Sequence, residues 1–187
     1  MGIILEVRPA RPDLDRWLSD PAVRVIHRRQ SAATADRLWQ AARELPLSDT
    51  RLLGRLIRFR IPGVAPATSF EDLFCNPPFT VLARGEMSLI SGLVGRIWTL
   101  RRDYPDVDPE EFRRWARSGT AKVLFAHWVQ RADSGRSELR SETRVEAFGT
   151  QGRLGLASVR PLIRGFEQLV GTDALAAAVR RAERGGD

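Results

Sequence analysis

The chain is poor in cysteine, histidine and lysine. Its single cysteine, Cys75, excludes an internal disulfide and fits a reduced, cytoplasmic setting. Two histidines, His27 and His127, lie a hundred residues apart, so no metal site is expected. Glycine-rich phosphate-binding loops are absent as well. The sequence therefore predicts no metal and no cofactor.

Long hydrophobic runs are also missing. No stretch approaches 18 consecutive uncharged apolar residues, so no membrane span is expected. The first 17 residues carry acidic side chains early and do not have the pattern of a signal peptide. With 187 residues, 43% of them hydrophobic, the chain is long enough for one domain with a substantial core.

The basic residues do not form the pattern of a nucleic-acid-binding protein. Thirty basic residues against 23 acidic ones give a net charge of +7, and all of the basic residues except Lys122 are arginine. A G+C-rich codon bias produces such an arginine excess without selection for phosphate contacts. The acids are interleaved with the arginines, and no basic stripe, zinc motif or aromatic-flanked RNA signature occurs. We therefore expect no nucleic-acid partner.

The clearest local signal is the alternating stretch 137–148. Charged side chains alternate with apolar or small ones, which is typical of a half-buried antiparallel strand. We expect the charged face to be solvated, with pairs worth about 0.2–1 kcal/mol each. Alternatively, this face could meet a partner subunit in a homodimer. The charged face comprises Glu138, Arg140, Glu142, Arg144 and Glu146, and the other face comprises Leu139, Ser141, Thr143, Val145 and Ala147.

The remaining periodicities predict an α+β domain. Residues 1–20 are punctuated by prolines and form an N-terminal extension that only Trp17 and Leu18 could anchor. Residues 21–187 form a single domain. Helices are expected near 34–45, 49–61 and 69–74 and along most of 152–183, with a break or kink at 171–173. Strands are expected at 23–30, 79–87, 88–100, 120–131 and 137–148.

The sequence leaves two features of this order open and indicates one turn. Residues 103–119 are either a short helix or a loop that closes one end of the sheet. The strand 120–131 is apolar on both faces, so its inward face is not defined. Asp133, Ser134 and Gly135 supply the hairpin turn before the alternating strand.

Three segments resemble a bacterial branch of the START-like (SRPBCC) superfamily. This superfamily includes the polyketide cyclase-like proteins. The three segments are Gly119–Phe125, the turn at Asp133–Gly135 and the tetrad Glu142–Val145, set within the strand and helix order of residues 23–184. The resemblance implies a helix-grip fold, in which a curved antiparallel sheet wraps around a long C-terminal helix, with two short helices after the first strand. It also implies a hydrophobic cavity between sheet and helix, whereas function varies widely across such folds.

We therefore expect a hydrophobic or aromatic small molecule, lipid-like or polyketide-like, to bind between the sheet and the C-terminal helix. The expected cavity is roughly 300 Å³ or larger. The hydroxyls on the inner face of strand 137–148 must find hydrogen-bond partners in protein, water or ligand. The predicted ligand-binding residues are Phe125, His127, Leu139, Ser141, Thr143, Val145, Val159, Ile163 and Phe166.

Two other classes of function remain open. An aromatase or cyclase would use the same cavity and needs an acid or base with a shifted pKa. The candidates are His27, with an acid such as Glu86 nearby, and His127, although a surface or core role for both histidines is the simpler interpretation. A protein–protein interaction module without ligand would instead use the charged strand face or the N-terminal extension.

Overall fold

The computed structural model describes residues 11–99, 103–132 and 134–185, and within them the chain forms one five-stranded antiparallel sheet. The strand order is β1-β5-β4-β3-β2, so β1 and β2 are the two edges. The predicted α+β class and all five expected strands are confirmed. The predicted turn residue Asp133 lies outside the described residues. The strands are β1 (Val23–Ser31), β2 (Thr80–Gly85), β3 (Ser88–Gly95), β4 (Ala121–Arg131) and β5 (Ser137–Ala147).

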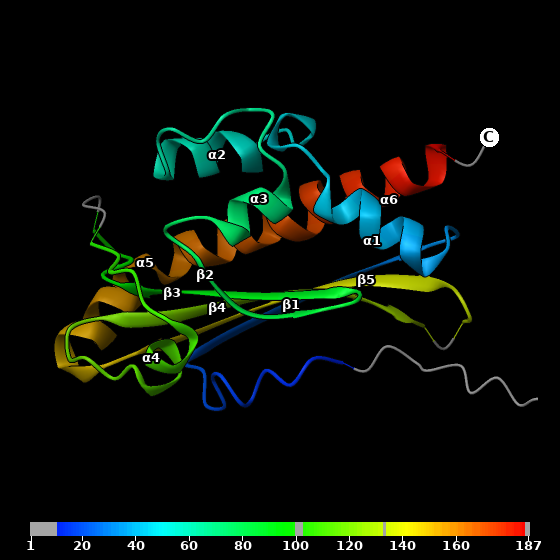
Figure 1. Cartoon of the computed structure of the whole chain (residues 1–187). Helices are drawn as coiled ribbons and strands as arrows, with labels where there is room; N and C mark the ends of the chain where they lie inside the picture. Colours follow the sequence, from blue (N-terminus) through cyan, green and yellow to red (C-terminus); the bar gives the residue numbers. More distant parts are fainter. Residues whose placement is uncertain (1–10, 100–102, 133, 186–187) are drawn as a thin grey trace, which may run out of the picture.

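Most helices lie on one face of the sheet (Figure 1). We call this the inner face; the outer face is covered by residues 11–18 and by α4 (Figure 1). None of the helices within the described ranges is long and apolar enough to cross a membrane. The helical elements are α1 (Ala35–Arg43), the 3₁₀ turn η1 (Leu47–Asp49), α2 (Leu53–Arg60), α3 (Phe70–Cys75), α4 (Pro109–Arg114), α5 (Gly149–Leu169), the π-helical turn η2 (Val170–Ala174) and α6 (Leu175–Arg184).

Local sequence explains where two short helices begin. At α3 the Ser69 hydroxyl accepts a hydrogen bond from the Asp72 N–H, as an N-cap does. Helix α4 starts with a capping box, in which Asp108 and Glu111 satisfy each other's backbone N–H groups. The segment 103–119 therefore contains a short helix, one of the two alternatives that its sequence allowed.

Helix α2 is capped by a residue far away in the chain. The Asp173 carboxylate accepts hydrogen bonds from the backbone N–H groups of Arg51, Leu52 and Leu53, at 2.9–3.2 Å. Burial alone would raise the pKa of Asp173, but these three donors outweigh it and hold the pKa below its usual range. Ser48 and Asp49, just before the helix, belong to η1.

The C-terminal helical run does not break at residues 171–173. It continues from α5 through η2 into α6, so the predicted irregularity is a π-helical turn within one helical run. Gly171 lies directly on His27: a Cβ at Gly171 would be 2.5 Å from the His27 Nδ1 atom. A glycine is therefore required where the helix passes closest to β1.

The outer face has a core of its own. Leu14, Trp17 and Leu18 are 2–6% exposed and pack against Trp128 and Phe112. The N-terminal extension is thus part of the domain from residue 11 onward. The even-numbered residues of β4 face this core, and the odd-numbered ones, including Phe125 and Val129, face the helices. The inward face of strand 120–131, which its sequence left open, is therefore the odd-numbered one.

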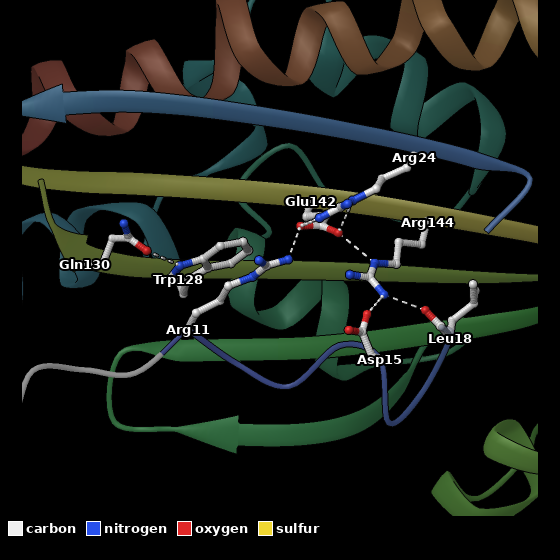
Figure 2. A network of polar contacts seen from close by, with 8 residues as sticks. All are labelled: Arg11, Asp15, Leu18, Arg24, Trp128, Gln130, Glu142 and Arg144. Atoms are coloured by element: carbon white, nitrogen blue, oxygen red, sulfur yellow. Dashed lines mark hydrogen bonds and ion pairs between the residues drawn. The ribbon is translucent and has the colours of Figure 1, made fainter. Parts of the chain in front are cut away.

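The prediction that the charged face of strand 137–148 is solvated is wrong. Glu142 and Arg144 are only 1% and 2% exposed, because residues 11–18 lie over them. Figure 2 shows their network: the Arg144 guanidinium donates to Glu142 at 2.6 Å, and to Asp15 and the Leu18 carbonyl at 2.5 Å. Glu142 and Arg144 therefore pair with the chain's own N-terminal segment, whereas Arg140 and Glu146 on the same face are half-buried.

Two more arginines complete the network around Glu142. Arg24 Nε donates to the carboxylate at 2.8 Å, and Arg11 Nη2 lies at 3.4 Å (Figure 2). Burial alone would raise the pKa of Glu142, but the hydrogen bonds from Arg24 and Arg144 reverse its effect, so the pKa lies below its usual range. The buried carboxylate is therefore ionised and fully partnered.

Candidate functional site

The inner face of the sheet aligns polar side chains in rows across neighbouring strands. One row runs from His27 on β1 through Ser141 on β5 to His127 on β4. The next row contains Thr143 on β5 and Phe125 on β4, followed by Ser91 on β3. Because paired residues of adjacent strands point to the same side, these side chains all face the helices.

Several polar atoms on this face have no hydrogen-bond partner. Among the described residues, the buried atoms without a partner include His127 Nε2, Ser91 Oγ and Ser141 Oγ. Buried polar groups in folded proteins are nearly always satisfied, and an unpaired one costs about 1–3 kcal/mol. Of these three residues, His127 lines the cavity described below, whereas Ser91 and Ser141 are not among its lining residues.

His127 is the most perturbed titratable group of the inner face. Burial lowers its pKa from 6.5 to about 4, so the imidazole is neutral at pH 7. Part of the ring borders a cavity, whereas its Nε2 atom is fully buried. The ring also contacts Phe74, with centroids 4.9 Å apart. A neutral imidazole in this position can donate or accept one hydrogen bond.

Phenylalanine rings pack around His127. Phe74 lies 5.0 Å from Phe79 and 5.4 Å from Phe125, between ring centroids, and Phe70 lies 6.2 Å from Phe74. Tilted and edge-on arrangements at these distances are favourable for aromatic pairs. The cluster ties α3 to the middle of the sheet and supplies an apolar wall beside the unpaired polar atoms.

A cavity of about 40 Å³ lies between the sheet and the helices α1, α3 and α6; we call it the inner-face cavity. Its volume is far below the expected 300 Å³, and because one water needs about 10–15 Å³ in such a measure, there is room for only a small group. It opens toward solvent on one side. It is lined by Trp39, Ala42, Arg43, Leu45, Phe70, Glu71, Phe74, Leu89, His127, Leu139, Val170, Ala174, Leu175 and Ala178.

The nine predicted ligand-binding residues do not form one site. His127 and Leu139 line the inner-face cavity, and Phe125 and Phe166 pack against the core cluster beside it. Ser141 is buried in the same row as His127, and Thr143 lies next to Phe125. The other three predicted residues lie elsewhere. Val145 and Ile163 belong to another packed cluster, and Val159 is half-buried on α5.

The hypothesis of a His27–Glu86 pair is wrong. His27 lies on β1 and Glu86 in the exposed turn between β2 and β3, and these strands are opposite edges of the sheet. The low pKa of His127, about 4, also makes it a weak general base at neutral pH. The residues proposed for acid–base chemistry thus do not form a catalytic arrangement in this structure.

Sequence reasoning missed the helical side of the cavity. Trp39 and Ala42 come from α1, and Ala174 and Ala178 come from the C-terminal run beyond the predicted break. The helical spacing of Trp39 and Ala42 was visible, but nothing local showed which helix covers the cavity. The Gly171–Asp173 segment was the available signal, because an interruption inside a long apolar helix often marks a functional position.

The cavity opens at a charged rim. Glu71 on α3 pairs with Arg43 on α1 at 3.3 Å and with Arg84 on β2 at 2.9 Å. Beside it lies a second hollow of about 30 Å³, which also contains Glu86. The two hollows share Trp39, Arg43, Glu71 and Leu89.

Within the described ranges, no three histidine, cysteine or acidic side chains lie close enough together to hold a metal ion. No protein-family model matches the chain, and no curated protein sequence matches it. One solved structure that is similar is the crystal structure of TTHA0849 from Thermus thermophilus, at 11% identity and a TM-score of 0.37. The match covers 88% of this chain and 100% of that one.

Proposed function

We propose that the protein binds a small hydrophobic or aromatic molecule on the inner face of the sheet, in a START-like helix-grip arrangement. The unpaired polar atoms His127 Nε2, Ser91 Oγ and Ser141 Oγ carry this proposal. They stand beside apolar walls, as in ligand sites where a few polar groups orient a mostly apolar molecule. The antiparallel sheet with the helical run 149–184 on one face supports the helix-grip arrangement.

The cavity volume limits the ligand. A hollow of about 40 Å³ has room for about three water molecules and is far smaller than a cavity of roughly 150 Å³ that takes up benzene, so an aromatic or lipid-like ligand fits only if the cavity widens. It widens only if the helices that line it, α1, α3 and α6, move away from the sheet.

Binding fits the site better than cyclase chemistry does. A cyclase needs an acid or base whose pKa lies near the working pH, whereas the pKa of His127 is lowered to about 4 and Glu86 lies in the exposed turn between β2 and β3. An interaction module that uses the charged strand face is also disfavoured, because that face is covered by residues 11–18.

Native mass spectrometry of the freshly purified protein tests the proposal. We expect an added mass from a bound small molecule, which denaturing conditions release. In the variant Ala42→Leu, a larger side chain fills the cavity from α1, so the added mass should disappear while the protein remains folded. Ala157→Leu, at an exposed position of α5, adds the same bulk and should keep the ligand.

Absence of any bound mass, together with no binding of small aromatic compounds to the purified protein, would overturn the proposal. Retention of the ligand by Ala42→Leu would place the site elsewhere. Thermal unfolding of both variants establishes that they are folded before binding is compared.

A further inference from the structure

The net positive charge of the chain comes from two segments that contain no acidic residue. The first spans residues 50–70 and includes α2, and the second spans residues 147–166 and includes most of α5. Together they carry seven arginines, and without these the 30 basic residues become 23, which equals the number of acidic residues. The rest of the chain is therefore electrically balanced. The seven are Arg51, Arg55, Arg58, Arg60, Arg153, Arg160 and Arg164.

The first of these segments also exposes an apolar stripe. Leu52, at the start of α2, and Leu56 and Phe59 within it are 53%, 41% and 76% exposed. Positions four and seven apart lie on one side of a helix, so these three side chains form one stripe. Leu53 and Ile57 pack inward instead. The fold thus leaves one apolar side of α2 uncovered.

Helix α5 has an exposed apolar side as well. Leu154 and Leu162 are 66% and 70% exposed, whereas Leu156 and Ile163 belong to a packed cluster. Both α2 and α5 lie on the helical side of the sheet, toward the end far from the C-terminus (Figure 1). Among the described residues outside the two segments, the large apolar side chains that are exposed are limited to Ile26 on β1, at 46%. Exposed apolar area and unbalanced charge therefore coincide.

The arginines of the two segments are available to a partner. Arg60 donates to the backbone carbonyls of Ile97 and Thr99. In the part of the chain that the structure describes, the other six are exposed and none of them forms an ion pair. Exposed guanidinium groups next to exposed apolar side chains match a surface that offers anionic groups above an apolar layer.

We propose that α2 and α5 form a docking surface for anionic lipid membranes. Leu56, Phe59 and Leu162 would enter the boundary between head groups and acyl chains, while the arginines bind the lipid phosphates. A second copy of the chain fits this surface poorly, because a symmetric contact brings the arginines of both copies together. A nucleic acid offers phosphates, but its backbone gives the apolar stripes nothing in which to be buried. The inference does not depend on the inner-face cavity.

Flotation of the full chain with lipid vesicles tests the inference. Vesicles of phosphatidylcholine alone are compared with vesicles that also contain phosphatidylglycerol. We expect binding to the anionic vesicles only, and a steep loss of binding as the salt concentration rises. Phe59→Gln should weaken binding about tenfold, because a large apolar side chain is lost from the contact. Ile26→Gln is the matched control and should bind as the unaltered protein does, since Ile26 lies outside both helices.

Arginine variants test the charged part of the surface. Arg58→Gln/Arg160→Gln should weaken binding to the anionic vesicles by about thirtyfold, because two guanidinium groups lose their contacts with the head groups. Arg113→Gln/Arg114→Gln removes the same charge from α4 on the outer face of the sheet, and should weaken binding by less than about threefold. Circular dichroism establishes that the variants are folded before binding is compared.

Four results would overturn the inference. One is equal binding to both kinds of vesicle, or to neither. Another is an equal loss in Arg113→Gln/Arg114→Gln, because binding would then depend on net charge alone. A DNA duplex that binds more tightly than the vesicles, and that Phe59→Gln does not weaken, would identify a nucleic-acid surface instead. A dimer in solution that Phe59→Gln dissociates would assign the apolar stripes to a second copy of the chain.

Discussion

The two faces of the sheet differ in whether their buried polar groups have hydrogen-bond partners. On the outer face, Glu142 and Arg144 are almost fully buried, and both are paired through the N-terminal segment. On the inner face, Ser91 and Ser141 are as deeply buried, yet their hydroxyls have no partner. The buried charges of the outer face thus have hydrogen-bond partners, whereas the buried serine hydroxyls of the inner face have none.

This difference indicates a structural role for the outer face, and it is the reason why we propose a binding site on the inner face. A buried ion pair persists only when its partners are held in place, so the outer face depends on residues 11–18. An unpaired buried hydroxyl costs stability and is kept only where something else benefits from it. Substitutions on the two faces should therefore have effects of opposite sign.

The largest effect is expected when the outer network is broken. Arg144→Met removes the buried arginine that joins Glu142 to Asp15 and the Leu18 carbonyl, and it should lower the free energy of unfolding by about 4 kcal/mol. Urea denaturation measures this loss. Arg113→Met removes an exposed arginine of α4 and should change stability by less than about 0.5 kcal/mol. A loss below about 1 kcal/mol for Arg144→Met would contradict a structural role for the network.

Removing the aromatic anchor of the same segment should have the next largest effect. Trp17 is 6% exposed, and Trp17→Ala should cost about 3 kcal/mol because the outer core loses a large side chain. If residues 11–18 then detach, Arg144 becomes accessible and the protection of its strand against hydrogen exchange should fall. Unchanged protection with unchanged stability would show that the segment contributes little to the fold.

The inner face should respond to pH through His127. The unfolded histidine binds a proton below pH 6.5, whereas the folded one does so only near pH 4, so stability is complete above pH 6.5 and falls as the pH drops to 4. We expect a loss of about 3 kcal/mol across this window beyond that of His127→Phe. Arg43 and Glu71, the charged residues of the same cavity, are present in both proteins. Parallel pH profiles of the two proteins would contradict the lowered pKa.

The smallest effect should be a gain. Ser91→Ala and Ser141→Ala remove unpaired buried hydroxyls and should each raise the free energy of unfolding by about 0.5–1 kcal/mol. Ser31→Ala is the control, since the buried Ser31 hydroxyl donates to Glu183 at 2.9 Å and its loss should cost about 1 kcal/mol. Losses of stability in both inner-face variants would mean that these hydroxyls are already satisfied.

Much of the fold follows from the sequence, because its elements are set by local patterns. The period of two in 137–148 predicts β5, and Ser69 and Asp108 cap helices from adjacent positions. Long-range contacts could not be predicted in this way. The burial of Glu142 depends on Asp15 and Arg24, and the cap of α2 comes from Asp173, more than a hundred residues away.

The candidate site was predictable only on the side of the strands. Alternation placed Leu139 and Ser141 on the inner face. His127 was a candidate too, but strand 120–131 is apolar on both faces, so only the structure shows that His127 points inward. The helical wall depends on how α1 and α6 pack on the sheet. The periodicity of a helix shows which of its faces is apolar, but not which strand or helix that face packs against. The charged rim at Glu71 likewise joins α1, α3 and β2, which no spacing in the sequence connects.

The docking of residues 11–18 has a consequence for the order of folding. Their partners on β5 lie 126–131 positions further along the chain, so this contact forms only after the sheet is nearly complete. Until then Trp17 and the apolar outer face stay exposed to water. Contacts made after the transition state affect the unfolding rate and leave the folding rate almost unchanged. We therefore expect Trp17 and Arg144 to set how long the native protein lasts, and to have little influence on how fast it forms.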